Sequence, residues 1–198
     1  MNRSRFVLVL VFIALGSLLS GCGANINVLR QAEPNPFIGQ KSYAVMPLET
    51  KGLLVGEKSE EQYLAEKDDG QKASFQGDKD AMGQRFEAEL VQRARNLGLT
   101  LVPGDKAPFV LRPRVVFVEP GFYAVLASAP SQATIRVAIT TPDGKVLDEI
   151  ELSHQTDSRN GISVGGISTN PSSGGRLRED AAAIGGTLAD YLAERAGL

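Results

Sequence analysis

Apolar and polar side chains alternate on both sides of a Pro-Asp-Gly sequence at positions 142–144, and this pattern constrains the fold more than any other feature. The alternating apolar residues are Ile135, Val137, Ile139, Ile150 and Leu152. Period-two alternation is typical of strands that bury one face, and Pro-Asp-Gly favours a tight turn. The sequence therefore predicts an antiparallel hairpin, and Asp148 within it predicts an irregularity of register.

Two longer segments show the three- and four-residue spacing of amphipathic helices. The first, residues 80–97, has the apolar positions Met82, Phe86, Leu90, Ala94 and Leu97. The second, residues 176–196, has Leu177, Ala181, Ile184, Leu188, Tyr191 and Leu192. Gly98 is placed to end the first helix. Gly185 and Gly186 lie inside the second, and they indicate that its backbone closely approaches a neighbouring element.

The remaining apolar segments predict further strands at residues 42–48 and 109–119, each interrupted by a proline. Pro47 confines the first of these strands to an edge or lies among its last residues, and Pro113 favours an edge or a bulge for the second, because proline cannot donate a backbone hydrogen bond. Residues 50–77 are densely charged and predict a solvated insertion, with a short helix at 60–67 that begins with a Ser59–Gln62 capping box. We expect an α+β two-layer sandwich: a mostly antiparallel sheet with two amphipathic helices.

The first residues have the pattern of a secretion signal. Arg3 and Arg5 precede an apolar run at residues 6–15, and small residues follow. A membrane-spanning helix needs roughly 20 apolar residues, whereas Gly16 and Ser17 interrupt this run. The sequence therefore predicts a signal peptide at residues 1–21.

The signal ends in Leu19-Ser20-Gly21-Cys22, which contains the only cysteine of the chain and resembles the lipobox of bacterial lipoproteins. The resemblance implies cleavage between Gly21 and Cys22 and a covalent lipid on the Cys22 sulfur, with membrane lipid as the partner of that residue. Gly23 stands where lipoproteins of the inner membrane carry an aspartate. The resemblance therefore favours a lipid anchor in the outer membrane, with the protein facing the periplasm.

After the signal we expect a flexible tether at residues 22–40, which is rich in Pro, Asn and Gln, and a single domain at residues 41–198. The whole chain has a formal net charge of −2, and it becomes more acidic once Arg3 and Arg5 are removed. This balance excludes a basic surface of the kind that binds nucleic acid. With one cysteine, no disulfide forms within the chain.

Residues 109–195 resemble a family of bacterial envelope lipoproteins that is known only as a domain of unknown function. The resemblance rests on four stretches: VLRPRVVFVEPG, TTPDGKVLDEIEL, NGISVGGISTNPSSGG and REDAAAIGGTLADYLAER. The order of strands and helices also resembles, more distantly, the α+β domains of envelope lipoproteins that form export pores or activate wall synthases. The resemblance implies a role in the envelope and assigns no residue to a reaction.

His154 is the only histidine, and Glu149, Glu151 and Asp157 lie near it in the sequence. A metal site needs further His or Cys ligands at matching spacing, and a serine triad needs a nucleophile in a Gly-x-Ser-x-Gly setting. The chain has neither pattern around His154, so we predict a surface histidine, no catalytic residues, no metal and no cofactor beyond the lipid on Cys22.

A glycine-rich stretch at residues 161–178 leads into the second helix. Its backbone amides, together with the arginine at the helix start, are suited to hold a phosphate, a carboxylate or a partner. The candidate residues are Gly165, Gly166, Gly174, Gly175 and Arg176. The alternative is an ordinary flexible loop, because the stretch lacks the Gly-Lys-Ser/Thr of a nucleotide loop.

Residues 121–130 form an apolar stretch between two predicted strands. Its candidate contact residues are Phe122, Tyr123, Val125 and Leu126, which as an exposed patch would bind a partner or the bilayer surface. The alternative is an ordinary strand or core segment. From these patterns we expect a non-enzymatic envelope lipoprotein that binds another envelope protein. The alternatives are an export-pore subunit, or a ligand-binding or hydrolytic domain that uses residues 161–178 and His154.

Overall fold

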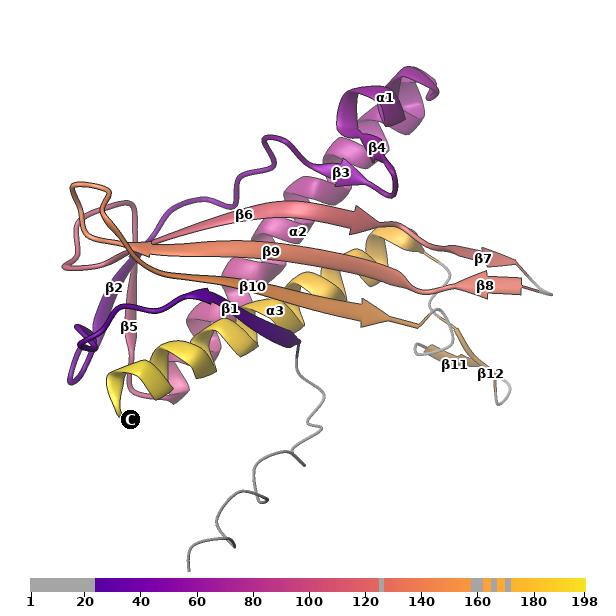
Figure 1. Cartoon of the computed structure of the whole chain (residues 1–198). Helices are drawn as coiled ribbons and strands as arrows, with labels where there is room; N and C mark the ends of the chain where they lie inside the picture. The colour runs from indigo at the N-terminus through magenta and orange to yellow at the C-terminus, as the bar shows by residue number, and fades with distance from the viewer. Residues whose placement is uncertain (1–23, 125–126, 158–161, 165–166, 170–171) are drawn as a thin grey trace, which may run out of the picture.

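A computed structural model describes residues 24–124, 127–157, 162–164, 167–169 and 172–198. It shows one mixed, mostly antiparallel sheet with two long helices on one face (Figure 1). The α+β two-layer fold predicted from the sequence is confirmed. Tyr43, Leu111, Ile135, Ile150 and the apolar faces of the helices form the core between the two layers.

The main sheet has the strand order β1-β10-β9-β6-β2-β5. Its strands are β1 (Asn25–Arg30), β2 (Ser42–Val45), β3 (Leu54–Val55), β4 (Lys58–Ser59), β5 (Thr100–Pro103), β6 (Val110–Glu119), β9 (Ser131–Thr140) and β10 (Val146–Thr156). Two small hairpins are formed by β7 (Phe122–Ala124) with β8 (Ala127–Ala129), and by β11 (Ile162–Val164) with β12 (Ile167–Thr169). The helices are α1 (Glu60–Ala65), α2 (Asp69–Asn96) and α3 (Ser173–Ala196).

The predicted central hairpin is β9–β10. Its turn is closed by hydrogen bonds between Thr141 and Lys145, and Gly144 has the positive φ of 91° that the turn requires. The strand register shifts between Val146 and Asp148, as expected. Asp148 thereby points into the core side, where it is completely buried.

Helices α2 and α3 pack against each other as well as against the sheet (Figure 1). At their closest approach, a Cβ built on Gly185 would lie 2.5 Å from the carbonyl oxygen of Phe86 in α2. Only glycine fits at that position, so the predicted close approach is confirmed and the neighbouring element is the partner helix. Gly98 follows α2 with a φ of 79° and ends it, as predicted.

The segment predicted as a tether belongs to the folded body. Strand β1 pairs with β10 over Asn25 to Arg30, and Phe37 beyond it is completely buried against Tyr43 and Phe109. The prediction of a flexible segment at 22–40 was therefore wrong for residues 25–40. The prolines and amide side chains of this segment therefore belong to a packed edge of the domain and do not mark a flexible linker.

Neither proline marks an edge of the sheet, but each agrees with the other expectation: Pro47 lies just past the end of its strand, and the strand of Pro113 shifts register between Val115 and Phe117. Strand β2 lies inside the sheet between β5 and β6, and it ends before Pro47. Strand β6 is central, and Pro113 lies beside an isolated bridge in which Glu49 bonds to the Pro113 carbonyl and to the Val115 amide. The pairing to Glu49 does not use the nitrogen of Pro113, so the proline is tolerated in a central strand.

The charged insertion is more ordered than the sequence indicated. Helix α1 begins with the predicted capping box, in which Ser59 and Gln62 exchange side-chain and backbone hydrogen bonds. Helix α2 begins eleven residues earlier than expected, at Asp69, with a second capping box formed by Asp68 and Gln71. Its first half is largely exposed, so the helical spacing of apolar residues is absent there although the helix continues.

No helix in the described part of the chain has the length and the apolar character needed to cross a membrane.

Candidate functional site

A hairpin arm extends the sheet beyond the helices. Strands β6 and β9 stay paired up to Glu119 and Gln132, and β7 and β8 continue the same hairpin outward (Figure 1). Gly121, with a φ of 62°, connects β6 to β7, and a Cβ there would collide with the carbonyl oxygens of Ala129 and Pro130. Glycine is thus required where the arm leaves the sheet.

The predicted apolar patch lies on this arm. Phe122 is 54% exposed and stands opposite Ala129. Tyr123 is the next residue of β7, whereas Val125 and Leu126 fall outside the described residues. An exposed phenylalanine on a protruding hairpin is suited to be buried in the contact with a partner.

A second, shorter arm is formed by β11 and β12 at the same end of the molecule (Figure 1). It occupies part of the stretch that was predicted as an anion-binding or partner loop. Gly165 and Gly166 of that prediction lie outside the described residues.

The other residues predicted for this loop are part of the N-terminal turn of α3. Gly174 packs against the Asp78 carboxylate of α2, and the amide of Gly175 donates to the capping hydroxyl of Ser172. Arg176 is completely buried and donates to the carbonyl oxygen of Pro120, at the base of the first arm. Arg176 therefore lies inside the fold and joins the base of the arm to α3, while the binding of an anion or a partner by this loop stays a prediction.

A buried polar cluster lies beside this contact. Asp180 of α3 is completely buried and accepts hydrogen bonds from the hydroxyls of Ser131 at 2.6 Å and Thr156 at 2.7 Å. His154 Nδ1 lies 2.9 Å from the same carboxylate. Ser131 begins β9 and Thr156 ends β10, so one carboxylate fixes two strand ends at the base of the arms.

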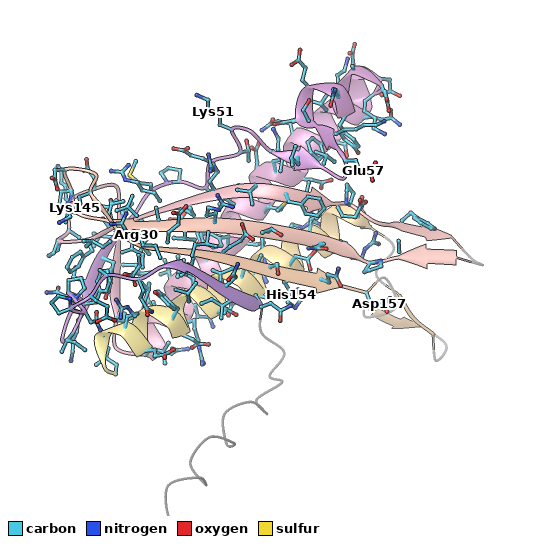
Figure 2. All side chains as sticks on the ribbon, in the orientation of Figure 1. Arg30, Lys51, Glu57, Lys145, His154 and Asp157 are labelled. Atoms are coloured by element: carbon cyan, nitrogen blue, oxygen red, sulfur yellow. The ribbon has the colours of Figure 1, made fainter. Side chains whose placement is uncertain are left out.

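His154 is therefore a partner of Asp180 and not a simple surface histidine, since its side chain is 23% exposed. With Asp180 ionised, Nδ1 carries the hydrogen and donates it, which leaves Nε2 as an acceptor. Figure 2 shows His154 near the end of β10 that lies toward the small hairpins, with Asp157 just beyond it. Ser131 is completely buried and turned to Asp180, so it is not an accessible nucleophile for this histidine.

A second buried carboxylate lies at the opposite end of α3. Asp148 accepts from Arg195 Nε at 2.8 Å, from the Tyr191 hydroxyl at 2.6 Å and from the amide of Ala32 at 2.8 Å. Burial, and then the hydrogen bond to Asp148, raises the pKa of Tyr191 well above its ordinary value. These contacts hold the N-terminal segment on α3.

Sequence reasoning did not assign Asp180 or the partners of Asp148. The signal for both was an acidic residue on an otherwise apolar face: Asp148 among Ile150 and Leu152, and Asp180 between Leu177 and Ala181. A carboxylate in such a position has to be paired, because an unpaired buried charge is very costly. The pattern thus predicts a buried cluster, although it does not name the partners.

A wide hollow of about 780 Å³ lies between β3, α1 and α2, and its lining does not include His154. In the described residues, no group of three His, Cys, Asp or Glu side chains is placed to hold a metal ion.

No family model and no curated protein matches the chain. Solved structures resemble its fold, and among them are two PelC dodecamers from Paraburkholderia phytofirmans. A single-residue variant of PelC aligns with a TM-score of 0.48 and 13% identity, over 85% of this chain and 96% of that chain. The second structure aligns with a TM-score of 0.47 and 12% identity, over 83% and 95%.

Proposed function

We propose that the protein is a lipid-anchored, non-enzymatic protein of the bacterial envelope, which binds another envelope protein through its arms. In this proposal Cys22 carries the lipid in the outer membrane, the domain faces the periplasm, and no cofactor other than the lipid takes part. The lipobox-like sequence Leu19-Ser20-Gly21-Cys22 supports the anchor. The observation that carries the binding role is the protruding arm with the exposed Phe122.

The arm is suited to binding because its base is rigid and its outer part is not covered. A two-stranded hairpin on its own is marginally stable in water. Here the base is held by Arg176 bound to Pro120 and by Ser131 bound to Asp180. Beyond this base, the strand edges and Phe122 are available to a partner that adds a strand or buries the aromatic ring.

The test combines mass spectrometry with crosslinking in intact membranes. We expect the mass of the detergent-extracted protein to show an acylated Cys22, and a Cys22→Ala variant to lose both the added mass and the membrane association. Crosslinking should give one recurrent envelope neighbour. Phe122→Ser should reduce the yield of that crosslink severalfold.

The matched control is Leu54→Ser, because Leu54 is 48% exposed and lies on β3, outside the arms. Equal crosslinking by the Phe122 and Leu54 variants would contradict a binding role for the arm. An unmodified Cys22 would contradict the anchor.

One observation favours a second function, a hydrolytic one. The pair of His154 and a fully buried Asp180 has the geometry of a base whose tautomer is fixed by a carboxylate. If His154 acts in this way, His154→Ala abolishes the function of the protein while the arm crosslink remains. Under the binding function, His154→Ala leaves the cellular role intact.

A further inference from the structure

Among the residues whose exposure the structure describes, the exposed large apolar side chains concentrate along one edge. Seven large hydrophobic residues of the described chain are exposed, and five of them lie on the N-terminal segment or at the end of α3. These five are Ile26 (44%), Val28 (46%), Leu29 (45%), Ile38 (67%) and Leu198 (53%). The other two, Leu54 on β3 and Phe122 on β7, lie away from this edge (Figure 1).

A series of hydrogen bonds makes this edge continuous. From residue 24 onward the N-terminal segment follows α3 toward its end. The contacts are Ala24 N to Thr187 Oγ1, Gln31 Nε2 to the Tyr191 hydroxyl, Arg195 Nη2 to Ala32 O, Asn35 Nδ2 to Arg195 O, and Gly39 N to Ala196 O. The segments that carry the five apolar side chains therefore lie side by side along one edge of the molecule, which we call the β1–α3 edge.

The proposed lipid is attached where this edge begins. Ala24 packs against the core, and its amide is bound to Thr187. Two peptide units separate Cys22 from Ala24, and they span at most about 7 Å. A lipid on Cys22 therefore holds the start of β1 at the membrane surface, without the slack that a tether of many residues would give.

We infer that the β1–α3 edge is a membrane-contact surface, which lies on the bilayer with Ile26, Val28, Leu29, Ile38 and Leu198 at the level of the lipid headgroups. The inference rests on the proposed lipid anchor. The occupant is lipid because Ala24, two residues along the chain from the proposed attachment point, begins the same edge that carries the apolar row.

The chemistry of β1 also limits how deep the contact goes. The outer edge of β1 is not paired with another strand of the described sheet, so its backbone amides and carbonyls need other partners. Such groups are not tolerated in hydrocarbon, where nothing pairs with them, but water and headgroups satisfy them at the interface. We therefore expect a shallow contact.

The chain allows a clean labelling experiment, because Cys22 is its only cysteine and acylation removes that thiol. Val28→Cys and Ile38→Cys variants of the lipidated protein are each labelled with an environment-sensitive fluorophore. They are then reconstituted into vesicles of equal parts phosphatidylethanolamine and phosphatidylglycerol. Leu54→Cys is the matched control, because Leu54 is as exposed as Val28 but lies on β3.

We expect lipids with a nitroxide near the headgroup to quench the labels at positions 28 and 38 severalfold more than the label at 54. Nitroxides deep in the acyl chain should quench all three weakly. Aqueous iodide should quench the label at 54 most.

Each contrary result has its own meaning. An unmodified Cys22 in the intact mass would overturn the anchor and the contact surface together. With Cys22 acylated, labels at 28 and 38 that iodide quenches as readily as the label at 54 would overturn the contact surface alone. Labels at 28 and 38 shielded from both iodide and nitroxide lipids would mean that protein covers the edge, which also overturns it.

Discussion

Two buried carboxylates lie at opposite ends of the interface between α3 and the sheet, and their partners differ in kind. Asp148 is bound by the charged Arg195, by Tyr191 and by the amide of Ala32. Asp180 is bound by the hydroxyls of Ser131 and Thr156 and by the half-buried His154. The first cluster closes the core over the N-terminal segment, whereas the second holds strand ends from which the arms project.

The difference shows that burial alone does not define the role of a charged residue. A carboxylate paired with a buried arginine is strongly coupled, because removing one partner leaves the other charge buried without compensation. The hydroxyls that hold Asp180 carry no charge, so a change of this carboxylate costs hydrogen bonds but leaves no buried arginine without its partner. We therefore expect the Asp148 end to govern global stability and the Asp180 end to govern the order of the arm base.

The largest effect is expected for Asp148→Asn. The amide keeps the size of the side chain but removes the charge that compensates Arg195, whose side chain is 10% exposed. The free energy of unfolding should fall by about 3 to 5 kcal/mol, as measured by denaturant titration. The control is Glu151→Gln, which breaks the half-exposed pair with Arg136 and should cost about 1 kcal/mol or less. Equal losses in both variants would remove the distinction between the buried and the exposed pair.

Gly185→Ala tests the middle of α3, between the two clusters. The new Cβ would lie 2.5 Å from the carbonyl oxygen of Phe86, so the helices must move apart. We expect a loss of about 1 to 3 kcal/mol in thermal or denaturant unfolding. Gly186→Ala is the neighbouring control: its nearest contact is Glu89 Cγ at 3.8 Å, and the better helix propensity should stabilise the protein by up to about 1 kcal/mol. Destabilisation by the control as well would argue against a local steric cause.

Asp180→Asn makes the same change at the other carboxylate. Hydrogen-bond donors now face both carboxylate oxygens of Asp180, and in the variant one of these donors would face the nitrogen of the asparagine amide. The free energy of unfolding should therefore fall by only about 1 to 2 kcal/mol. Amide hydrogen exchange should show lost protection at the ends of β9 and β10, with β1 unaffected. Gln155→Ala, on the exposed side of the same strand, is the control. Uniform loss of protection across the sheet would contradict a role confined to the arm base.

The smallest effect concerns pH and Asp78, which lies between Gly174 and Arg178 at the N-terminus of α3. Burial raises the pKa of Asp78, and the nearby Arg178 only partly opposes it. The carboxyl group of Asp78 thus binds a proton more tightly in the folded state than in the unfolded state. The protonated carboxyl therefore contributes stability below the unfolded pKa, and this stability is lost as the pH rises through the folded pKa. Asp78→Asn should therefore raise the unfolding midpoint at neutral pH relative to the wild type, and this gain should vanish in acid. Asp69→Asn, which removes an exposed carboxylate from the same helix, is the control.

The parts of the fold that follow from local pattern could be predicted from the sequence. The β9–β10 hairpin is defined by alternation and a Pro-Asp-Gly turn, and the ends of the helices by Ser59 and Gly98. The buried faces of both long helices follow from their spacing. In each case the residues that determine the element are neighbours in the chain.

The parts that depend on distant partners could not be predicted. Strand β1 is only six residues long and mixes polar with apolar side chains. Its pairing is determined by β10, more than a hundred positions away. The first half of α2 has few buried residues, so the capping residue Asp68 is its main local signal. In the candidate site, Phe122 was identified as a possible contact residue from its apolar surroundings, but Asp180 and the buried contact of Arg176 required the packing of α3.

The hydrogen bonds between the N-terminal segment and α3 also determine when the chain can finish folding. Ala24 and Thr187 are 163 positions apart, as are Ala32 and Arg195. During synthesis the first strand has no strand to pair with until β10 has been made, and the N-terminal segment gains its contacts with α3 only near the end of the chain. Bringing such distant segments together is slow. A chain cut short before Thr187 would lack these contacts between the N-terminal segment and α3, and such an incompletely packed chain is open to degradation and aggregation.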